Sequence, residues 1–329
     1  MIIARVPFRV SFLGGGSDFL PHFRKHGGAV LATAIDSYVY VTVAPYKGTF
    51  HGSRYKLAYS RMEQVSELDD IEHPAIREAI RFACPSVDLE LHHISDLPAC
   101  TGLGSSSSFV VGMLQALYGL QNRMVPTHQL ASEAIRIERE ILRETGGYQD
   151  QVLAAYGGIN LVEFADGGQF VVRRLPIARE RVAEIERHCL LLYTGVRRNS
   201  FDVLGEQSRR NGNGQNTNTL DQLAELAREG ARLLVGNAPL TGFGELLHEG
   251  WQLKKQLADV SLPEIDEAYE RARAAGASGG KVLGAGKGGF LLLWAPPDRH
   301  EDVVQAVDGG MTPMRIGINA PGATLIHSL

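Results

Sequence analysis

The segment PACTGLGSSSSFVVGML, at residues 98–114, joins a glycine- and serine-rich loop directly to an apolar run. The preceding DLELHHISDLP alternates like a strand, and Pro98 ends that pattern. Residues 105–119 are apolar on most sides and predict a buried helix. Backbone amides at a helix N-terminus bind anions, and glycine lets the backbone approach a phosphate closely. The segment therefore predicts a strand, a phosphate-binding loop and a helix.

Two simpler interpretations of this segment are a flexible linker and an ordinary helix cap. Serine does cap helices, but four serines after Gly102-Leu103-Gly104 exceed what a cap requires. The loop is not the common P-loop, because no Gly-Lys-Ser/Thr follows at the required spacing. Serine hydroxyls suit a hard cation such as Mg²⁺, which takes oxygen ligands.

The rest of the chain predicts strands first and then helices mixed with strands. Strands are expected in the alternating or β-branched segments 2–14, 27–45 and 188–195, in a hairpin near 157–176, and late in the chain at TPMRIGI. The polar segment 206–220 predicts an exposed loop, and helical patterns follow it through residue 270. This order favours an α+β fold. We expect two domains, at residues 1–185 and 186–329.

Composition excludes several classes of protein. The 329 residues are 44% hydrophobic and carry a formal net charge of −4, which offers no basic field for nucleic acid or an anionic membrane. The N-terminus lacks the pattern of a signal peptide, and no apolar run reaches the roughly 20 residues of a membrane span. The three cysteines suggest neither a disulfide framework nor a zinc site. A cytoplasmic location is the expectation.

One glutamate stands out in the amphipathic helix expected at 128–145, with Thr127 as its N-cap and Gly146 as its C-cap. The neighbours three and four residues from Glu138 are all apolar, whereas those of Glu140 are mostly charged. Glu138 therefore faces the core, where an unpartnered carboxylate is costly. A bound divalent cation would offset that cost; a boundary position that reaches water or an arginine is the alternative.

Two other features leave alternatives open. Asp150, in GGYQDQV, is placed either to position a hydroxyl beside a metal-bound phosphate or to serve as a turn or N-cap residue. Gly284, Gly286 and Gly289 satisfy the G-x-G-x-x-G pattern, but a strand rather than a helix is expected to follow. That context argues against a dinucleotide site and leaves either a tight turn or a functional loop.

Three segments together resemble the motifs of the GHMP kinases: RVPFRVSFLGGGSD, PACTGLGSSSS and GKVLGAGKGG. The resemblance implies a ribosomal protein S5 domain 2-like N-terminal domain, a ferredoxin-like C-terminal domain, and use of ATP and Mg²⁺. It implies that Ser106 and Glu138 bind the metal, and that Arg9 and Asp150 are catalytic. Glu138 lies twelve residues before Asp150, the spacing that galactokinases have between the same two roles.

The resemblance also implies which residues surround the ligands. The ATP phosphates would be bound by Pro98, Gly102, Leu103, Gly104, Ser105, Ser106 and Ser107. The acceptor would be bound by Gly14, Gly15, Gly16, Ser17, Asp18 and Asp150. Arg197 follows the buried strand expected at 188–195, so it either reaches the acceptor or is a surface charge. The third motif, at Gly284, Ala285, Gly286, Gly288 and Gly289, would support these loops.

Within the family, PFRVSFLGGGSDF, HGGAVLATAIDSYVYVTV, GGYQDQ and AAYGGIN are similar to bacterial D-glycero-D-manno-heptose 7-phosphate kinases. Those enzymes phosphorylate the anomeric hydroxyl to give the 1,7-bisphosphate, on the GDP-heptose route to capsule and other surface glycans. The 7-phosphate would need a cation, for which the candidates are Arg24, Lys25, Arg54, Arg197 and Arg198. The alternatives are another anomeric sugar kinase, resembling a fucokinase or galactokinase, and a non-catalytic sensor of sugar and ATP. A homodimer is left open.

Overall fold

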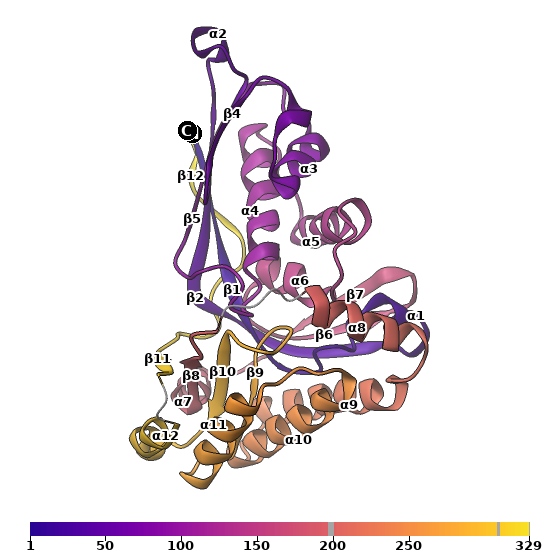
Figure 1. The fold of residues 1–329 in the computed structure, drawn as a ribbon, viewed down its shortest axis with the longest axis vertical. Coiled ribbons are helices and arrows are strands. Elements are labelled where there is room, and N and C mark those ends of the chain that lie inside the picture. The colour runs from indigo at the N-terminus through magenta and orange to yellow at the C-terminus, as the bar shows by residue number, and fades with distance from the viewer. Residues whose placement is uncertain (197–200, 308–309, 329) are drawn as a thin grey trace.

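The computed structural model describes residues 1–196, 201–307 and 310–328. Two β-sheets organise this part of the chain, one of eight strands and one of four. Figure 1 shows the larger sheet as a long, curved layer, with the smaller sheet and most of the later helices at one end of it.

The larger sheet is built around two long neighbouring strands. Strand β1 pairs antiparallel with both β2 and β12, and β2 pairs with β6 through its first half and with β5 through its second half. Its strands are β1 (Ile2–Leu13), β2 (Gly28–Pro45), β3 (Tyr55–Ala58), β4 (Met62–Val65), β5 (Leu89–Ser95), β6 (Ile159–Ala165), β7 (Gln169–Arg174) and β12 (Thr324–Ser328). The register of β1 against β2 shifts between Pro7 and Arg9. A shift of this kind re-aims the following side chains, and here it immediately precedes Arg9.

Helix α4 (Ser105–Leu120) packs against β1 and β2, with most of its side chains buried. Figure 1 shows α3 and α5 on the same side of the larger sheet as α4. The other helices of this half are α1 (Leu20–His26), α2 (Gly48–His51), α3 (Pro74–Ala83), α5 (Thr127–Ile135), the π-helix η2 (Arg136–Ile141), α6 (Gln149–Tyr156) and α7 (Arg179–His188), with short 3₁₀ turns at Leu68–Asp70 and Asp166–Gly168. The expected strands and the buried helix of this half are therefore present.

The smaller sheet is antiparallel, in the order β11, β8, β10, β9. Its strands are β8 (Cys189–Tyr193), β9 (Gly279–Val282), β10 (Phe290–Trp294) and β11 (Thr312–Met314). The helices of this later part of the chain are α8 (Phe201–Gly212), α9 (Thr217–Val235), α10 (Thr241–Leu257), α11 (Pro263–Ala274) and α12 (His300–Val307), with a 3₁₀ turn at Pro297–Arg299. Helix α9 packs on β2 and α10 on β9, so these two helices join the two sheets.

Two expectations from the sequence are wrong. Most of the segment 206–220 is helical rather than an exposed loop, because the buried stripe of α8 is itself partly polar: Val203, Gln207 and Asn211 recur at every fourth position and are all buried. The helix expected at 128–145 starts at Thr127, with Pro126 at its N-cap position, and its π-helical continuation ends at Ile141. Arg143 adopts a left-handed φ of 56°, so Gly146 does not cap this helix.

The C-terminal strand β12 returns to the larger sheet beside β1. The division into residues 1–185 and 186–329 stays a prediction, and the second of these segments contributes strands to both sheets. None of the helices in the described part of the chain combines the length and the apolar character that crossing a membrane requires.

Candidate active site

A cavity of about 480 Å³ lies where the three glycine-rich segments meet. Its size falls within the usual range for small-molecule sites. Fifteen of the residues singled out from the sequence line it: Arg9, Gly15, Gly16, Asp18, Gly102, Gly104, Ser105, Ser106, Ser107, Glu138, Asp150, Gly284, Ala285, Gly286 and Gly288. Segments far apart in the chain therefore form one site.

The loop before α4 is held against the third glycine segment by close backbone contact. A Cβ on Gly102 would lie 2.6 Å from the Leu283 carbonyl oxygen, and one on Gly284 would lie 2.5 Å from the Gly102 Cα. Gly104 occupies the N-cap position of α4 with φ 80°, a left-handed conformation that favours glycine. The first turn of α4, with its unpaired amides and three serines, consequently opens into the cavity.

Glu138 is the buried carboxylate of this site, with 1% of its surface exposed. Its Oε2 accepts a hydrogen bond from Ser107 Oγ at 2.8 Å and another from the Gln151 amide. Its Oε1 is buried and has no hydrogen-bond partner among the described residues. Burial raises the pKa of Glu138 to about 7, although the nearby Arg139 guanidinium opposes that shift.

These oxygens fit a hard cation. An unpartnered carboxylate oxygen and serine hydroxyls are the donor types that Mg²⁺ takes, with phosphate oxygens and water completing its shell. No cluster of three or more His, Cys, Asp or Glu side chains arranged for a metal occurs among the described residues. Of the serines at the start of α4, Ser107 donates the hydrogen bond to Glu138, whereas Ser106 lines the cavity without a hydrogen bond to Glu138. The metal-binding role of Ser106 and Glu138 therefore stays a prediction.

Arg9 and Asp150 form a two-point ion pair beside the loop. Arg9 Nε and Nη2 donate to the two carboxylate oxygens of Asp150, each at 2.7 Å, and Nη1 donates to the Gly102 carbonyl at 2.7 Å. Arg9 is 4% exposed, whereas the Asp150 side chain is 23% exposed. The pair fixes Asp150 at the start of α6 and leaves part of its carboxylate open to the cavity.

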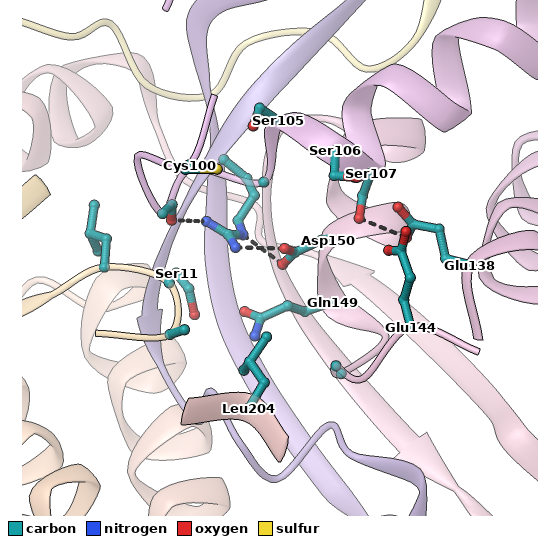
Figure 2. Close-up of a pocket in the computed structure, with 18 of the residues that line it drawn as sticks. Ser11, Cys100, Ser105, Ser106, Ser107, Glu138, Glu144, Gln149, Asp150 and Leu204 are labelled. Carbon is teal, nitrogen blue, oxygen red and sulfur yellow. Dashed lines mark hydrogen bonds and ion pairs between the residues drawn. The ribbon is translucent and has the colours of Figure 1, made fainter. Parts of the chain in front are cut away.

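Figure 2 shows Asp150 between two groups of side chains. Ser106, Ser107, Glu138 and Glu144 lie on one side of it, and Ser11, Gln149 and Leu204 lie on the other. The part of the cavity lined by the start of α4 and by Glu138 is called here the half beside α4. The part lined by Ser11, Gly15, Gly16 and Asp18 is called the half beside the first glycine segment, and Asp150 lies between the two groups of side chains.

Gly15 and Gly16, of the first glycine segment, form part of the wall of the second half. Asp18 is fully buried and accepts hydrogen bonds from the backbone amides of Gly16 at 2.9 Å and Gln149 at 3.1 Å. Burial raises the pKa of Asp18, and the charge of Asp150 acts in the same direction. Asp18 thus ties the glycine segment to the residue that precedes Asp150.

Some predicted site residues lie outside the cavity lining. Ser17 Oγ donates to the Gly14 carbonyl, and a Cβ on Gly14 would lie 1.9 Å from the Ala29 carbonyl oxygen, so both shape the turn. The Leu103 carbonyl accepts from the Arg9 amide. Pro98 and Gly289 also lie outside the lining, as do Arg24, Lys25 and Arg54. Arg197 and Arg198 fall outside the described residues.

Two buried lysines escaped sequence reasoning. Lys254, on α10, is 6% exposed and donates from Nζ to the Gly284 carbonyl at 2.5 Å; Lys281, on β9, is 5% exposed and donates to the Phe12 carbonyl at 3.1 Å. Both line the cavity. Burial lowers the pKa of Lys254 to about 8, and burial together with the Lys254 charge lowers the pKa of Lys281 well below its usual value.

Replacing Lys254 with methionine should raise stability and lower activity. A buried ammonium whose pKa is lowered costs folding free energy below about pH 8, and that cost fades as the pH rises toward the unfolded value. We expect Lys254→Met to be more stable than the wild type by roughly 2 kcal/mol at pH 7, with a smaller difference at pH 9.5. Urea unfolding at both pH values measures this. Equal stability differences at the two pH values would contradict it.

The cavity half beside α4 extends to an aromatic end that the sequence did not predict. Tyr59, His73, His93 and Phe109 line it, and the rings of His93 and Phe109 are 4.6 Å apart between centroids. Burial lowers the pKa of both His73 and His93. Neutral imidazole and phenyl rings offer a flat, largely apolar surface.

Comparisons with known proteins identify the family that the chain resembles. Residues 73–158 match the model of the GHMP kinases N terminal domain, and residues 216–311 match that of the GHMP kinases C terminal region. The chain is 28% identical to D-glycero-alpha-D-manno-heptose 7-phosphate kinase of Campylobacter jejuni, over 93% of each chain. It is 25% identical to galactokinase of Pyrococcus furiosus, over 93% of this chain and 92% of that one.

A solved structure shares the fold across the whole chain. The crystal structure of a D-glycero-D-manno-heptose 1-phosphate kinase from Bacteroides thetaiotaomicron superposes with a TM-score of 0.82 at 27% identity, covering 100% of both chains. The α+β fold expected from the sequence, with its two characteristic regions, is thereby confirmed.

Proposed function

The chain belongs to the GHMP kinases, and from this we propose that it is an ATP-dependent kinase of D-glycero-D-manno-heptose 7-phosphate. The reaction would place the ATP γ-phosphoryl group on the C1 hydroxyl and give the 1,7-bisphosphate, for GDP-heptose and surface-glycan synthesis. The observation that carries the kinase assignment is the position of Asp150, which is fixed by Arg9 between a phosphate-binding loop and a second, polar chamber of one cavity.

The half beside α4 is the proposed nucleotide site. Its helix N-terminus and glycine amides suit the ATP phosphates, and its aromatic end, at His93 and Phe109, suits a planar base. Glu138 and Ser106 would hold Mg²⁺, with Ser107 orienting Glu138 through its hydrogen bond. A bound Mg²⁺ supplies charge neutralisation of the phosphate oxygens.

The second half is the proposed acceptor site. Asp150 positions the acceptor hydroxyl and takes its proton as the new bond forms between that oxygen and the γ-phosphorus, while the bond from phosphorus to the bridging oxygen of ADP breaks. Arg9 holds the Asp150 carboxylate and offsets charge on the transferred group. Lys254 lines the cavity within the electrostatic reach of Asp18 and Asp150. Its ammonium group, when protonated, adds positive charge to this half, which supports an acceptor that itself carries a phosphate.

The test is ADP release with ATP and Mg²⁺ over a panel of acceptors. The panel consists of D-glycero-D-manno-heptose 7-phosphate, the corresponding 1-phosphate, D-mannose, L-fucose, D-galactose and sedoheptulose 7-phosphate. We expect turnover with the heptose 7-phosphate and a new phosphorus signal at C1. Turnover of an unphosphorylated sugar instead would support the assignment as a sugar kinase but reject the heptose phosphate as its substrate. The similarity to galactokinase would then favour a kinase of an unphosphorylated sugar. Nucleotide binding with no turnover of any acceptor would contradict the kinase assignment and favour a sensor.

A further inference from the structure

The acceptor half of the cavity contains three buried polar atoms that have no hydrogen-bond partner among the described residues. They are Ser11 Oγ, Gln149 Oε1 and Gln207 Nε2. All three side chains line the cavity, and Gln207 is only 3% exposed. Buried polar atoms are almost always paired, so three unpaired ones in the same chamber indicate that something else pairs with them.

These three side chains surround the backbone of the first glycine segment. A Cβ on Gly15 would lie 3.3 Å from Ser11 Oγ and 3.5 Å from Gln149 Nε2, and a Cβ on Gly16 would lie 2.7 Å from Gln207 Nε2. Figure 2 shows Ser11 and Gln149 on the same side of Asp150, with Leu204 of α8 beside them. Gln207 therefore brings α8, from the later part of the chain, to the same spot as β1 and α6.

The chemistry of the three atoms narrows the class of ligand. An amide nitrogen is a donor, an amide oxygen is an acceptor, and a serine hydroxyl is both. A sugar hydroxyl donates and accepts, so a polyhydroxylated ligand satisfies all three at once. A phosphate offers acceptors only and would leave Gln149 Oε1 unpaired, which favours a sugar hydroxyl over a phosphate at this spot.

We propose that Gln207 is a specificity-determining residue of the acceptor site, whose Nε2 donates to one hydroxyl of the sugar. Ser11 and Gln149 bind further hydroxyls of the same molecule, and the absence of a side chain at Gly16 leaves room for the contact. The inference rests on the proposed function, because it assigns a residue to the acceptor half of that site. The proposal assigns part of the recognition of sugar hydroxyls to α8. Gln207 lies in the segment 206–220, which the sequence predicted to be an exposed loop.

The experiment compares Gln207→Met with Gln215→Met, using the acceptor that the wild-type chain phosphorylates. Methionine keeps the length of the side chain and removes the amide. Gln215 is exposed and lies on the turn after α8, so its replacement is the matched control. We expect Gln207→Met to lose about tenfold in kcat/KM for the sugar, with KM for ATP and ATP hydrolysis without sugar unchanged. Gln215→Met should match the wild type in all three.

A series of monodeoxy sugars identifies the hydroxyl and separates binding from structure. In the wild type, the deoxy sugar that lacks the contacted hydroxyl should lose about tenfold in kcat/KM relative to the parent. In Gln207→Met that same sugar should perform as well as the parent, whereas the other deoxy sugars still lose activity. A structural defect would lower kcat/KM for every sugar and for ATP alike, and that result would overturn the proposal.

Gln207→Glu provides a second variant if Gln207→Met does not fold. It keeps the shape and removes the donor, so it should reproduce the tenfold loss for the sugar. If a folded Gln207 variant phosphorylated the sugar with the same kcat/KM as the wild type, this inference alone would be overturned. A wild-type chain that phosphorylates no sugar would overturn the proposed function and this inference together.

Discussion

Replacing Asp150 with asparagine should lower kcat by at least about a hundredfold, with little change in KM for the sugar. Asparagine keeps the size of the side chain but has no negative charge and only one acceptor oxygen. It therefore cannot take the proton of the sugar hydroxyl, and it holds Arg9 by one hydrogen bond instead of the two at 2.7 Å. Steady-state kinetics at saturating ATP, with the sugar varied, measure the effect.

The control for this variant is Asp166→Asn. Asp166 is also an aspartate near a turn, but its side chain is 80% exposed and its nearest cation, Arg24, is 3.8 Å away. It should behave as the wild type. Asp150→Asn should also unfold at a lower temperature, because Arg9 is 4% exposed and loses half of a buried pair. A tenfold or larger rise in KM at normal kcat would show that Asp150 only binds the sugar and takes no part in the transfer.

The sequence predicted Glu138 because a helix places residues three and four apart on the same face. The same reasoning would have found Lys254, whose neighbours at those spacings are Gly250, Trp251, Leu257 and Ala258. The two adjacent lysines in WQLKKQL suggest a solvent-exposed helix surface. Only when the helix face of each lysine is considered separately does Lys254 fall on the apolar side. Lys281 offers no such signal, because it lies on a short strand directly after two glycines. Its hydrogen-bond partner, the Phe12 carbonyl, lies on β1, far away in the sequence.

Gln207 could not have been found from hydrophobic periodicity. Its helix buries amides where most helices bury leucines, so residues 206–220 have the composition of a loop. Strand β12 escaped for another reason, since its partner β1 lies at the opposite end of the chain. The long strands β1 and β2 and the loop before α4 were predictable because their patterns are local. The two halves of the cavity could not be predicted, because they depend on how segments that are distant in the sequence pack together.

The π-helix η2 bears directly on how Glu138 is placed. It spans Arg136–Ile141 and follows α5 without a break. The helix therefore contains one extra residue in the turn from which the Glu138 side chain points inward. Such bulges are often found at functional sites. The wider turn brings Glu138 to Ser107 while Glu140, two residues further on, remains in solvent at 66% exposure of its side chain. This difference makes Glu140 the natural control for Glu138.

Replacing Glu138 with glutamine should remove most of the response to Mg²⁺. We expect the Mg²⁺ concentration for half-maximal activity to rise at least about tenfold, because one anionic ligand becomes a neutral amide. Glu140→Gln should leave the Mg²⁺ titration unchanged. An unchanged titration in Glu138→Gln would remove this residue from the proposed metal site, whatever happened to the overall rate.

The same variant should stabilise the protein in the absence of Mg²⁺ and nucleotide. The pKa of Glu138 is raised to about 7 by burial, so between about pH 4.5 and 7 the folded chain holds a proton that the unfolded chain has released. The unfolding free energy of the wild type therefore falls as the pH rises through this window. Glutamine carries no charge, so Glu138→Gln should exceed the wild type by roughly 3 kcal/mol at pH 8 and match it at pH 4.5.

Urea unfolding in Mg²⁺-free buffer at the two pH values measures this difference. Adding Mg²⁺ and ADP should then narrow this difference at pH 8, because the wild type binds the metal more tightly and so gains more binding free energy than the variant. A carboxylate that costs stability when the site is empty and returns part of that cost when the ligand is bound is placed for binding rather than for folding. If Glu138→Gln were less stable than the wild type at pH 8 without Mg²⁺, the carboxylate would instead be holding Ser107 and Gln151 in place.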